Sequence, residues 1–331
     1  MTDPLIAVEG LVKRFYLKGQ DYVGAVNGIS FQIGPGETLG LVGESGSGKT
    51  TVGRCLLRLI EPTSGHIWFE GTDITRLTKR ELKPLRSRLQ MVFQDPFASL
   101  NPRRTVRQTV EEPLALQRDA PARDWPGMIT EILERVGLGP QYLDRFPIEL
   151  TASEQQRVGI ARALITSPKL VVLDEPTSTL DPTVREEILG LLRSLQSSMS
   201  VAYLFISHDI MAVERLSHRV AVMYLGHIVE QAPTAAIMSD PRHPYTRALM
   251  SAVLSPDPTR RLPRNLVVGE IPSAINPRRE CPFYSRCPIR LDHCLDDVPV
   301  MAAVGSEHGA ACLRWRDSSE VLAEVAPESL D

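Results

Sequence analysis

The sequence predicts an α/β fold with a parallel sheet, a helical insert and a small cysteine-rich region near its C-terminal end. Three observations predict this fold. A short apolar stretch, residues 37–42, runs into a glycine-rich loop and then into a segment, up to residue 60, with helical periodicity. Two later apolar stretches, residues 170–173 and 201–206, have the length of buried strands and end in polar side chains. The chain between residues 101 and 159 has a helical pattern instead, and so predicts an insert between two parts of the sheet.

The remaining elements follow from short apolar runs and turn residues. We expect two early strands over residues 5–12 and 25–33, with Gly34, Pro35 and Gly36 separating the second from the strand at 37–42. A hairpin is predicted around residues 65–75 and a strand over 89–93. The helical insert includes residues 128–137, which end on glycine as helices often do. After about residue 232 the composition shifts toward proline, arginine and cysteine, which indicates an appended region.

The glycine-rich loop after residue 42 matches the pattern G-x-x-x-x-G-K-[ST]. Its residues are Gly43, Glu44, Ser45, Gly46, Ser47, Gly48, Lys49, Thr50 and Thr51. A strand before such a loop and a helix after it let backbone N–H groups and the helix N-terminus surround a polyphosphate. We expect Lys49 to reach the β- and γ-phosphates and the Thr50 hydroxyl to bind Mg²⁺. The sequence therefore predicts an ATP site with Mg²⁺.

Aromatic residues precede the loop and offer a surface for a nucleotide base. Phe15 is our candidate, with Tyr16 and Tyr22 nearby; ordinary packing is the alternative interpretation of each.

Polar residues at strand ends supply the rest of the predicted site. Asp174 and Glu175 follow the apolar run 170–173, so Asp174 is expected to organise Mg²⁺ and Glu175 to orient or deprotonate a water. Gln94 ends the strand at 89–93, where it could bind Mg²⁺ or water. His208 follows the strand at 201–206 and could contact the γ-phosphate, although a lone histidine is more often structural.

In their order along the chain, these motifs resemble the ATP-binding cassette (ABC) transporter ATPases, over about residues 5–235. The resemblance implies a RecA-like core with an antiparallel β subdomain in residues 1–235, a helical subdomain at about 97–160, and an extension over 236–331. It also implies catalytic roles for Glu175, His208 and Gln94, and adenine stacking on Phe15. A further family motif, the D-loop, corresponds to Ser178, Thr179, Leu180 and Asp181. Members of the family form head-to-tail dimers with two ATP molecules between them.

The family's signature Leu-Ser-Gly-Gly-Gln is altered in this chain. Thr151, Ala152, Ser153 and Glu154 follow Leu150 instead. Thr151 and Glu154 have the spacing of a capping box, in which the helix start satisfies its own N–H groups. A carboxylate about 4 Å from a phosphate charge costs about 4 kcal/mol at an effective dielectric constant near 20. We therefore expect a signature that completes a partner's ATP site poorly; the alternative is that the changes are tolerated.

An altered signature favours an asymmetric heterodimer with a second ABC ATPase subunit. The Lys49, Asp174 and Glu175 of this chain would then meet a normal signature and hydrolyse ATP.

Four of the five cysteines lie close together in the sequence. They are Cys281, Cys287, Cys294 and Cys312, while Cys55 stands alone. Without an export signal, such a cluster predicts a metal site before disulfides. The short spacing typical of structural zinc is absent, so an iron–sulfur cluster is favoured over Zn²⁺, with free cysteines as the alternative. The flanking residues 243–246, 269–273 and 281–283 resemble the extension of oligopeptide/dipeptide importers, some of which bind a [4Fe-4S] cluster.

The composition excludes several other classes of function. Thirty-seven basic and 40 acidic residues give a net charge of −3, which argues against nucleic acid as a partner. We expect neither a signal peptide nor a membrane span of about 20 apolar residues. The resemblance implies a peripheral protein at the cytoplasmic face of the membrane, bound to two permease subunits that work with an extracytoplasmic substrate-binding protein. The alternatives are a regulatory nucleotide-binding subunit, an importer of nickel, sugars or opines, and a soluble ABC protein of translation or DNA repair.

Overall fold

The computed structural model describes residues 3–117, 121–251 and 269–316. The chain forms two compact units. Of the described residues, the first unit contains those at 3–7, 32–38 and 67–207, and the second contains those at 8–31, 39–66 and from 208 onward. The appended region and the phosphate loop therefore belong to the same unit.

Three parallel strands form the centre of the first unit. Strand β7 (Leu170–Asp174) pairs on one side with β6 (Leu89–Val92), Leu170 facing Leu89, and on the other with β8 (Ala202–Ser207), Leu170 facing Ala202. All residues of β7 and β8 are buried, which explains why both read as continuous apolar runs.

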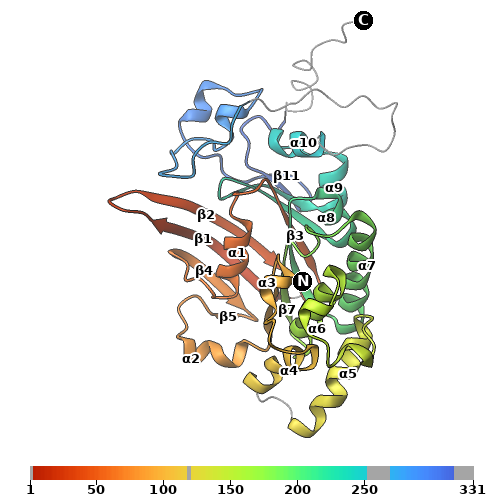
Figure 1. The fold of residues 1–331 in the computed structure, drawn as a ribbon. Coiled ribbons are helices and arrows are strands. Elements are labelled where there is room, and N and C mark those ends of the chain that lie inside the picture. Colours follow the sequence, from red (N-terminus) through yellow and green to blue (C-terminus); the bar gives the residue numbers. More distant parts are fainter. Residues whose placement is uncertain (1–2, 118–120, 252–268, 317–331) are drawn as a thin grey trace, which may run out of the picture. The chain divides into compact units, whose positions relative to one another are not determined.

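The helices of this unit include the insert between β6 and β7. They are α2 (Lys79–Leu82), α3 (Pro96–Ser99), α4 (Val106–Gln117), α5 (Trp125–Arg135), α6 (Ala152–Leu164) and α7 (Pro182–Met199). Helices α4, α5 and α6 contact one another and appear in yellow to green in Figure 1. Helix α7 is tied back by Gln196, whose Nε2 donates to the Thr38 hydroxyl at 2.6 Å and to the Gly36 carbonyl at 3.0 Å.

The second unit contains a mixed sheet built around β9 (Arg219–Tyr224). Strand β3 (Thr38–Val42), which leads into the phosphate loop, pairs with β9 in parallel, and β10 (His227–Pro233) pairs with it antiparallel. Strand β12 (His308–Ala310) then pairs with β10, and β11 (Ala302–Gly305) with β12. The C-terminal strands thus extend the sheet that holds the phosphate loop.

The other elements of the second unit come from both ends of the chain. They are β1 (Ile6–Tyr16), β2 (Tyr22–Ile33), α1 (Lys49–Leu56), α8 (Ile210–Leu216), α9 (Thr234–Ser239) and α10 (Pro244–Ser251), with the first two residues of β1 and the last two of β2 in the first unit. Strand β4 (Ser64–Phe69), which begins here and ends in the first unit, pairs with the short β5 (Thr72–Asp73) in the predicted hairpin. The C-terminal segment joins β2 through a bridge between Ile275 and Val23.

Most predicted elements are confirmed, but the end of β1, the start of β2 and the end of α1 were wrong. Phe15 and Tyr16 do not lie between strands; they end β1, while Tyr22 begins β2. The helix after the phosphate loop was expected to reach residue 60 but ends at Leu56, because Arg58 takes a left-handed backbone conformation with φ +51°. The helix in the insert does close at Gly137, where φ is +78°. Within the described ranges, no helix is long and apolar enough to cross a bilayer.

Candidate functional site

The phosphate loop folds around the ammonium group of Lys49. Lys49 begins α1 and is 5% exposed. Its Nζ donates to the carbonyls of Gly43 at 2.7 Å and Glu44 at 2.9 Å, and lies 3.3 Å from the Ser47 hydroxyl. The positive charge is thus held at the centre of the loop, directly before the positive end of the α1 dipole, where a phosphate is attracted.

Two glycines of the loop are required by close backbone contacts. A Cβ atom on Gly43 would lie 2.1 Å from the carbonyl oxygen of Met223, and one on Gly48 would lie 2.1 Å from that of Ala25. Gly48 also has φ +104°, and Gly46 has φ +81° with open space around it. Only glycine lets the chain turn its N–H groups inward here, as the sequence pattern predicted.

The C-terminal region also contacts this loop, which the sequence did not predict. The backbone N–H of Glu44 donates to the Tyr245 hydroxyl at 2.9 Å. The Glu44 carboxylate forms an ion pair with Arg286 at 2.8 Å. Residues 242 and 201 positions apart cannot be paired from spacing, and no motif marks either partner.

Phe15 is accessible, as a base-stacking residue must be. Its side chain at the end of β1 is 39% exposed, and Lys13 places its Nζ 5.0 Å from the ring centroid. Tyr16 is 69% exposed and packs against Tyr22 with ring centroids 6.2 Å apart. Both Phe15 and Tyr16 therefore remain candidates on exposure.

The first unit brings together Gln94 and Glu175. Gln94 Nε2 donates to Glu175 Oε2 at 3.3 Å. Asp174 ends β7 and is 2% exposed. Glu175 follows it with φ +46°, a left-handed conformation that few residues other than glycine adopt, and its N–H donates to the Ile206 carbonyl at 2.9 Å. The main chain of Glu175 is thus held by β8, and its carboxylate is held by the amide side chain of Gln94.

The predicted D-loop lies directly after this carboxylate. The Ser178 hydroxyl donates to the Glu175 carbonyl at 3.1 Å. Thr179 and Leu180 follow, and Asp181 caps α7 by accepting from the N–H groups of Thr183 and Val184, each at 3.1 Å.

His208 follows β8, as predicted, and belongs to the second unit. Its side chain is exposed. Asp209 after it caps α8 through the N–H group of Met211 at 2.9 Å.

The altered signature forms the predicted capping box at the start of α6. Thr151 is the N-cap; its N–H donates to Glu154 Oε2 at 2.8 Å, and its hydroxyl accepts from the Glu154 N–H at 3.3 Å. Tyr142 adds a hydrogen bond to Glu154 Oε1 at 2.7 Å, which the sequence did not predict. Burial opposes ionisation of Glu154, but the bonds from Tyr142 and Thr151 outweigh it and lower the pKa of the carboxyl. Ala152 and Ser153 form the first turn between these residues.

The four clustered cysteines line one small cavity of about 20 Å³. Cys281 donates its N–H to the Cys294 carbonyl at 2.9 Å. Burial raises the pKa of Cys281 and of Cys287 to about 11 and that of Cys312 to about 12, which favours the neutral thiol form of these three side chains. Thiols facing one cavity are the donor set of a zinc or iron–sulfur site. Their arrangement, however, is not that of a formed site: no three histidine, cysteine or carboxylate side chains in the described part of the chain are grouped to hold a metal ion.

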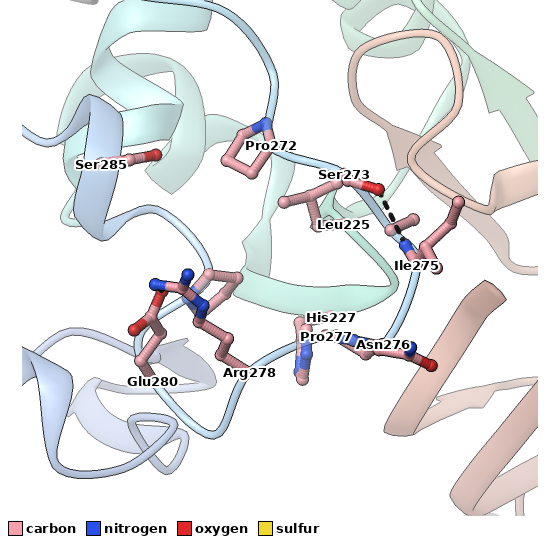
Figure 2. Close-up of a pocket in the computed structure, with 12 residues that line it drawn as sticks. Leu225, His227, Pro272, Ser273, Ile275, Asn276, Pro277, Arg278, Glu280 and Ser285 are labelled. Carbon is pink, nitrogen blue, oxygen red and sulfur yellow. Dashed lines mark hydrogen bonds and ion pairs between the residues drawn. The ribbon is translucent and has the colours of Figure 1, made fainter. Parts of the chain in front are cut away.

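A larger cavity, of about 410 Å³, lies between the turn at Leu225–His227 and the C-terminal segment. Figure 2 shows that segment, in which the Ile275 N–H donates to the Ser273 hydroxyl at 3.1 Å. Burial lowers the pKa of His227 to about 4, so its imidazole is neutral at neutral pH. Gly226, in the same turn, donates its N–H to the Ser47 carbonyl at 2.9 Å, so the turn also supports the phosphate loop.

Known protein families match both the region of the phosphate loop and the C-terminal region of the chain. Residues 26–178 match the ABC transporter family, and residues 229–294 match the C-terminal region of oligopeptide/dipeptide transporters. A probable peptide ABC transporter ATP-binding protein of Sinorhizobium fredii is 45% identical over 94% of this chain and 90% of its own length. A putative peptide import ATP-binding protein of Brucella ovis is 44% identical over 95% of this chain and 99% of its own length. A glutathione import ATP-binding protein of Salmonella choleraesuis is 50% identical over 84% of this chain, but that covers 46% of the relative.

Solved structures show the same fold. A dimeric ATP-binding cassette in a post-hydrolysis state with ADP and Pi matches 69% of this chain and 98% of its own with a TM-score of 0.64 at 26% identity. A subunit of the ABC transporter complex cbiONQ from Clostridium perfringens matches 72% of this chain and 92% of its own, also with a TM-score of 0.64, at 28% identity. With the phosphate loop, the acidic strand end and full-length relatives in agreement, the chain belongs to the ABC transporter family, as an ATP-hydrolysing subunit with the C-terminal region of the oligopeptide/dipeptide type.

Proposed function

We propose that this chain is the ATPase subunit of an importer for peptides. One relative named as a peptide ABC transporter ATP-binding protein and one named for peptide import match this chain over 90% and 99% of their length, including the C-terminal region, and this observation carries the proposal. A third relative is named for glutathione import, so small peptides of this kind are candidate solutes. Nickel, sugars and opines are the alternative solutes.

In this proposal the chain is peripheral at the cytoplasmic face of the membrane. It binds two permease subunits there, and an extracytoplasmic substrate-binding protein delivers the solute. The cassette occupies residues 1–235 with its helical subdomain at about 97–160, and the extension occupies 236–331.

The chain's own residues divide the work of ATP hydrolysis. Residues 43–51 cradle the triphosphate, with Lys49 on the β- and γ-phosphates, and Phe15 stacks on the adenine. Mg²⁺ would be held by Thr50, Gln94 and Asp174 and would neutralise charge between the phosphates. Glu175 orients or deprotonates the attacking water, and His208 contacts the γ-phosphate. The hydrogen bond from Gln94 to Glu175 supports this assignment, because it holds the proposed base beside a residue proposed to bind Mg²⁺.

Transport in reconstituted vesicles tests the function. The complex with its permeases should take up labelled dipeptides, oligopeptides or glutathione with Mg-ATP, and uptake should stop in Lys49→Ala. Uptake of nickel or sugars with no peptide uptake would contradict the proposed solute class. A complex that binds Mg-ATP without steady-state hydrolysis would make the chain a regulatory subunit.

We further infer that the chain works in an asymmetric heterodimer with a second ABC ATPase. The capping box supports this, since α6 begins with its N–H groups bonded to its own side chains and with a carboxylate in its first turn. The N-terminus of α6 therefore attracts a partner's γ-phosphate only weakly, because the Glu154 carboxylate offsets the positive end of the helix dipole. Ser178, Thr179, Leu180 and Asp181 would form the D-loop of this subunit.

Separate substitutions in the two subunits distinguish the active site. Glu175→Gln in this chain should abolish steady-state ATPase activity of the complex, whereas the matching change in the partner should leave a measurable part. Loss of activity from the partner's change alone would refute the assignment. Isolation of an active homodimer would refute the heterodimer itself.

We also propose that Cys281, Cys287, Cys294 and Cys312 bind a [4Fe-4S] cluster, with Zn²⁺ as the alternative. The four thiols facing one cavity support this, although their side chains would have to approach one another. Binding would release the thiol protons. Iron and acid-labile sulfide should be found in anaerobically purified protein. Stoichiometric zinc without sulfide would refute the cluster in favour of a zinc site. Protein that contains neither iron nor zinc would refute the metal site itself.

A further inference from the structure

Glu44 places a carboxylate in the loop that binds the triphosphate. Its side chain is 31% exposed, so water screens the charge only in part. A negative charge in an anion-binding loop opposes binding of the nucleotide. The chain therefore needs either to direct this carboxylate away or to neutralise it.

Arg286 neutralises this carboxylate through a two-pronged contact. Its Nη1 donates to Glu44 Oε2 at 2.8 Å and its Nη2 to Glu44 Oε1 at 3.1 Å. The Arg286 side chain is 10% exposed, and its Nη1 also lies 3.3 Å from the Tyr224 hydroxyl. A bidentate arginine–carboxylate pair of this kind fixes direction as well as charge.

Tyr245 holds the backbone of the same residue. Its hydroxyl accepts the Glu44 N–H at 2.9 Å, and its ring packs on Tyr224 at 4.7 Å and on Phe283 at 5.5 Å between centroids. Phe283 packs edge-on against Tyr224 at 5.3 Å. The C-terminal region thus contacts Glu44 at both its amide and its carboxylate, next to a cluster of three packed aromatic rings.

We propose that Arg286 is a positioning residue of the nucleotide site, which holds the Glu44 carboxylate away from the triphosphate and cancels its charge. The C-terminal region is then part of the ATP site of its own subunit. The inference rests on nucleotide binding at the phosphate loop. It also gives the sequence segment around Arg286 a role that is independent of any metal bound by the neighbouring cysteines.

The Kd values for Mg-ATP of single and double variants distinguish an effect of the Glu44 charge from an effect of Arg286 on the fold. In Arg286→Ala the carboxylate stays in the loop unpaired, so we expect the Kd for Mg-ATP to rise about tenfold. Glu44→Gln removes the charge and should change Kd by less than about threefold. The double variant Glu44→Gln/Arg286→Ala should return to within about threefold of wild type, since no unpaired carboxylate remains. Arg286→Lys keeps the charge without the two-pronged geometry and should fall between.

Titration with a fluorescent ATP analogue and Mg²⁺ measures these constants on the full chain, with circular dichroism melting to confirm folding. Arg290→Ala is the matched control, because this exposed arginine lies in the same region, over the Tyr284 ring, and should not change Kd. In the assembled transporter, Arg286→Ala should raise KM for ATP more than it lowers kcat. Higher salt should reduce the Arg286→Ala defect by screening the carboxylate.

Two results would overturn the inference. Unchanged affinity in Arg286→Ala would show that the ion pair has no effect on the nucleotide. Equal weakness in Arg286→Ala and the double variant would show that Arg286 acts only on the fold. Failure of the wild-type chain to bind Mg-ATP would instead remove the proposed ATP site itself.

Discussion

Three Gly→Ala substitutions should have three different effects, because the structure gives these glycines different surroundings. At Gly48 a new Cβ atom would lie 2.1 Å from the Ala25 carbonyl oxygen, and φ is +104°. Gly46 has φ +81° but open space for a Cβ atom. Gly127, in the first turn of α5, has open space and no positive φ, so alanine fits there.

The magnitudes follow from strain and overlap. A left-handed alanine costs about 1–2 kcal/mol, and an overlap that backbone atoms cannot avoid adds about 1–3 kcal/mol. Gly48→Ala should therefore disfavour the loop by about 2–5 kcal/mol, which weakens Mg-ATP binding from about 30-fold to more than 1,000-fold. Gly46→Ala carries only the strain and should weaken binding by about 5- to 30-fold. Gly127→Ala should raise the free energy of unfolding by about 0.5–1 kcal/mol.

Equilibrium titration with a fluorescent nucleotide and thermal melting of each variant would measure both quantities. Equal effects of Gly46→Ala and Gly48→Ala would refute the argument from close contact. Wild-type affinity in Gly48→Ala would refute the whole account of the loop.

Three further substitutions have defined outcomes. Thr151→Ala removes the N-cap of α6 and should lower the free energy of unfolding by about 1 kcal/mol in urea titrations. Lys49→Ala should abolish ATP binding and hydrolysis while circular dichroism stays unchanged. Glu230 is buried beside His308, with Nε2 2.7 Å from Oε1, and Glu230→Ala should destabilise the second unit by about 3–5 kcal/mol, against no change for the exposed Glu214→Ala. Burial alone would raise the pKa of the Glu230 carboxyl, but hydrogen bonds from His308 and two backbone N–H groups outweigh it and lower the pKa. The ionised Glu230 carboxylate therefore stabilises the fold above the ordinary carboxyl pKa, and this contribution is lost as the pH falls through the lower pKa of the folded state. Between pH 6 and 3, the unfolding free energy of Glu230→Ala should depend less steeply on pH than that of the wild type.

Local patterns in the sequence predicted most of the fold. The strands β6, β7 and β8 follow from buried apolar runs, and the phosphate loop follows from the spacing of its glycines, lysine and threonine. The capping box of Thr151 and Glu154 followed from their spacing alone, because both partners lie within one turn. Each of these features depends on residues close together along the chain.

The contacts that escaped prediction join distant parts of the chain. Arg286 and Tyr245 contact the phosphate loop from the C-terminal part of the chain, in which β12 and β11 extend the sheet of β9 and β10, and the composition of residues 236–331 does not encode these contacts. The end of α1 was also misjudged, since the left-handed Arg58 is not a glycine and carries no stop signal. The cysteines show the reverse case, in which close spacing places four thiols on one cavity without specifying their final distances.

The left-handed backbone of Glu175 affects how substitutions at this position should be interpreted. Glycine would relax the main chain there and asparagine would be tolerated, whereas most other residues keep the strain of about 1–2 kcal/mol. A glutamine at this position keeps the backbone strain and can still accept the hydrogen bond from the Gln94 amide. Glu175→Gln therefore measures the effect of the lost carboxylate charge alone. A glycine variant would combine lost chemistry with a more stable turn, and could melt at a higher temperature than the active enzyme.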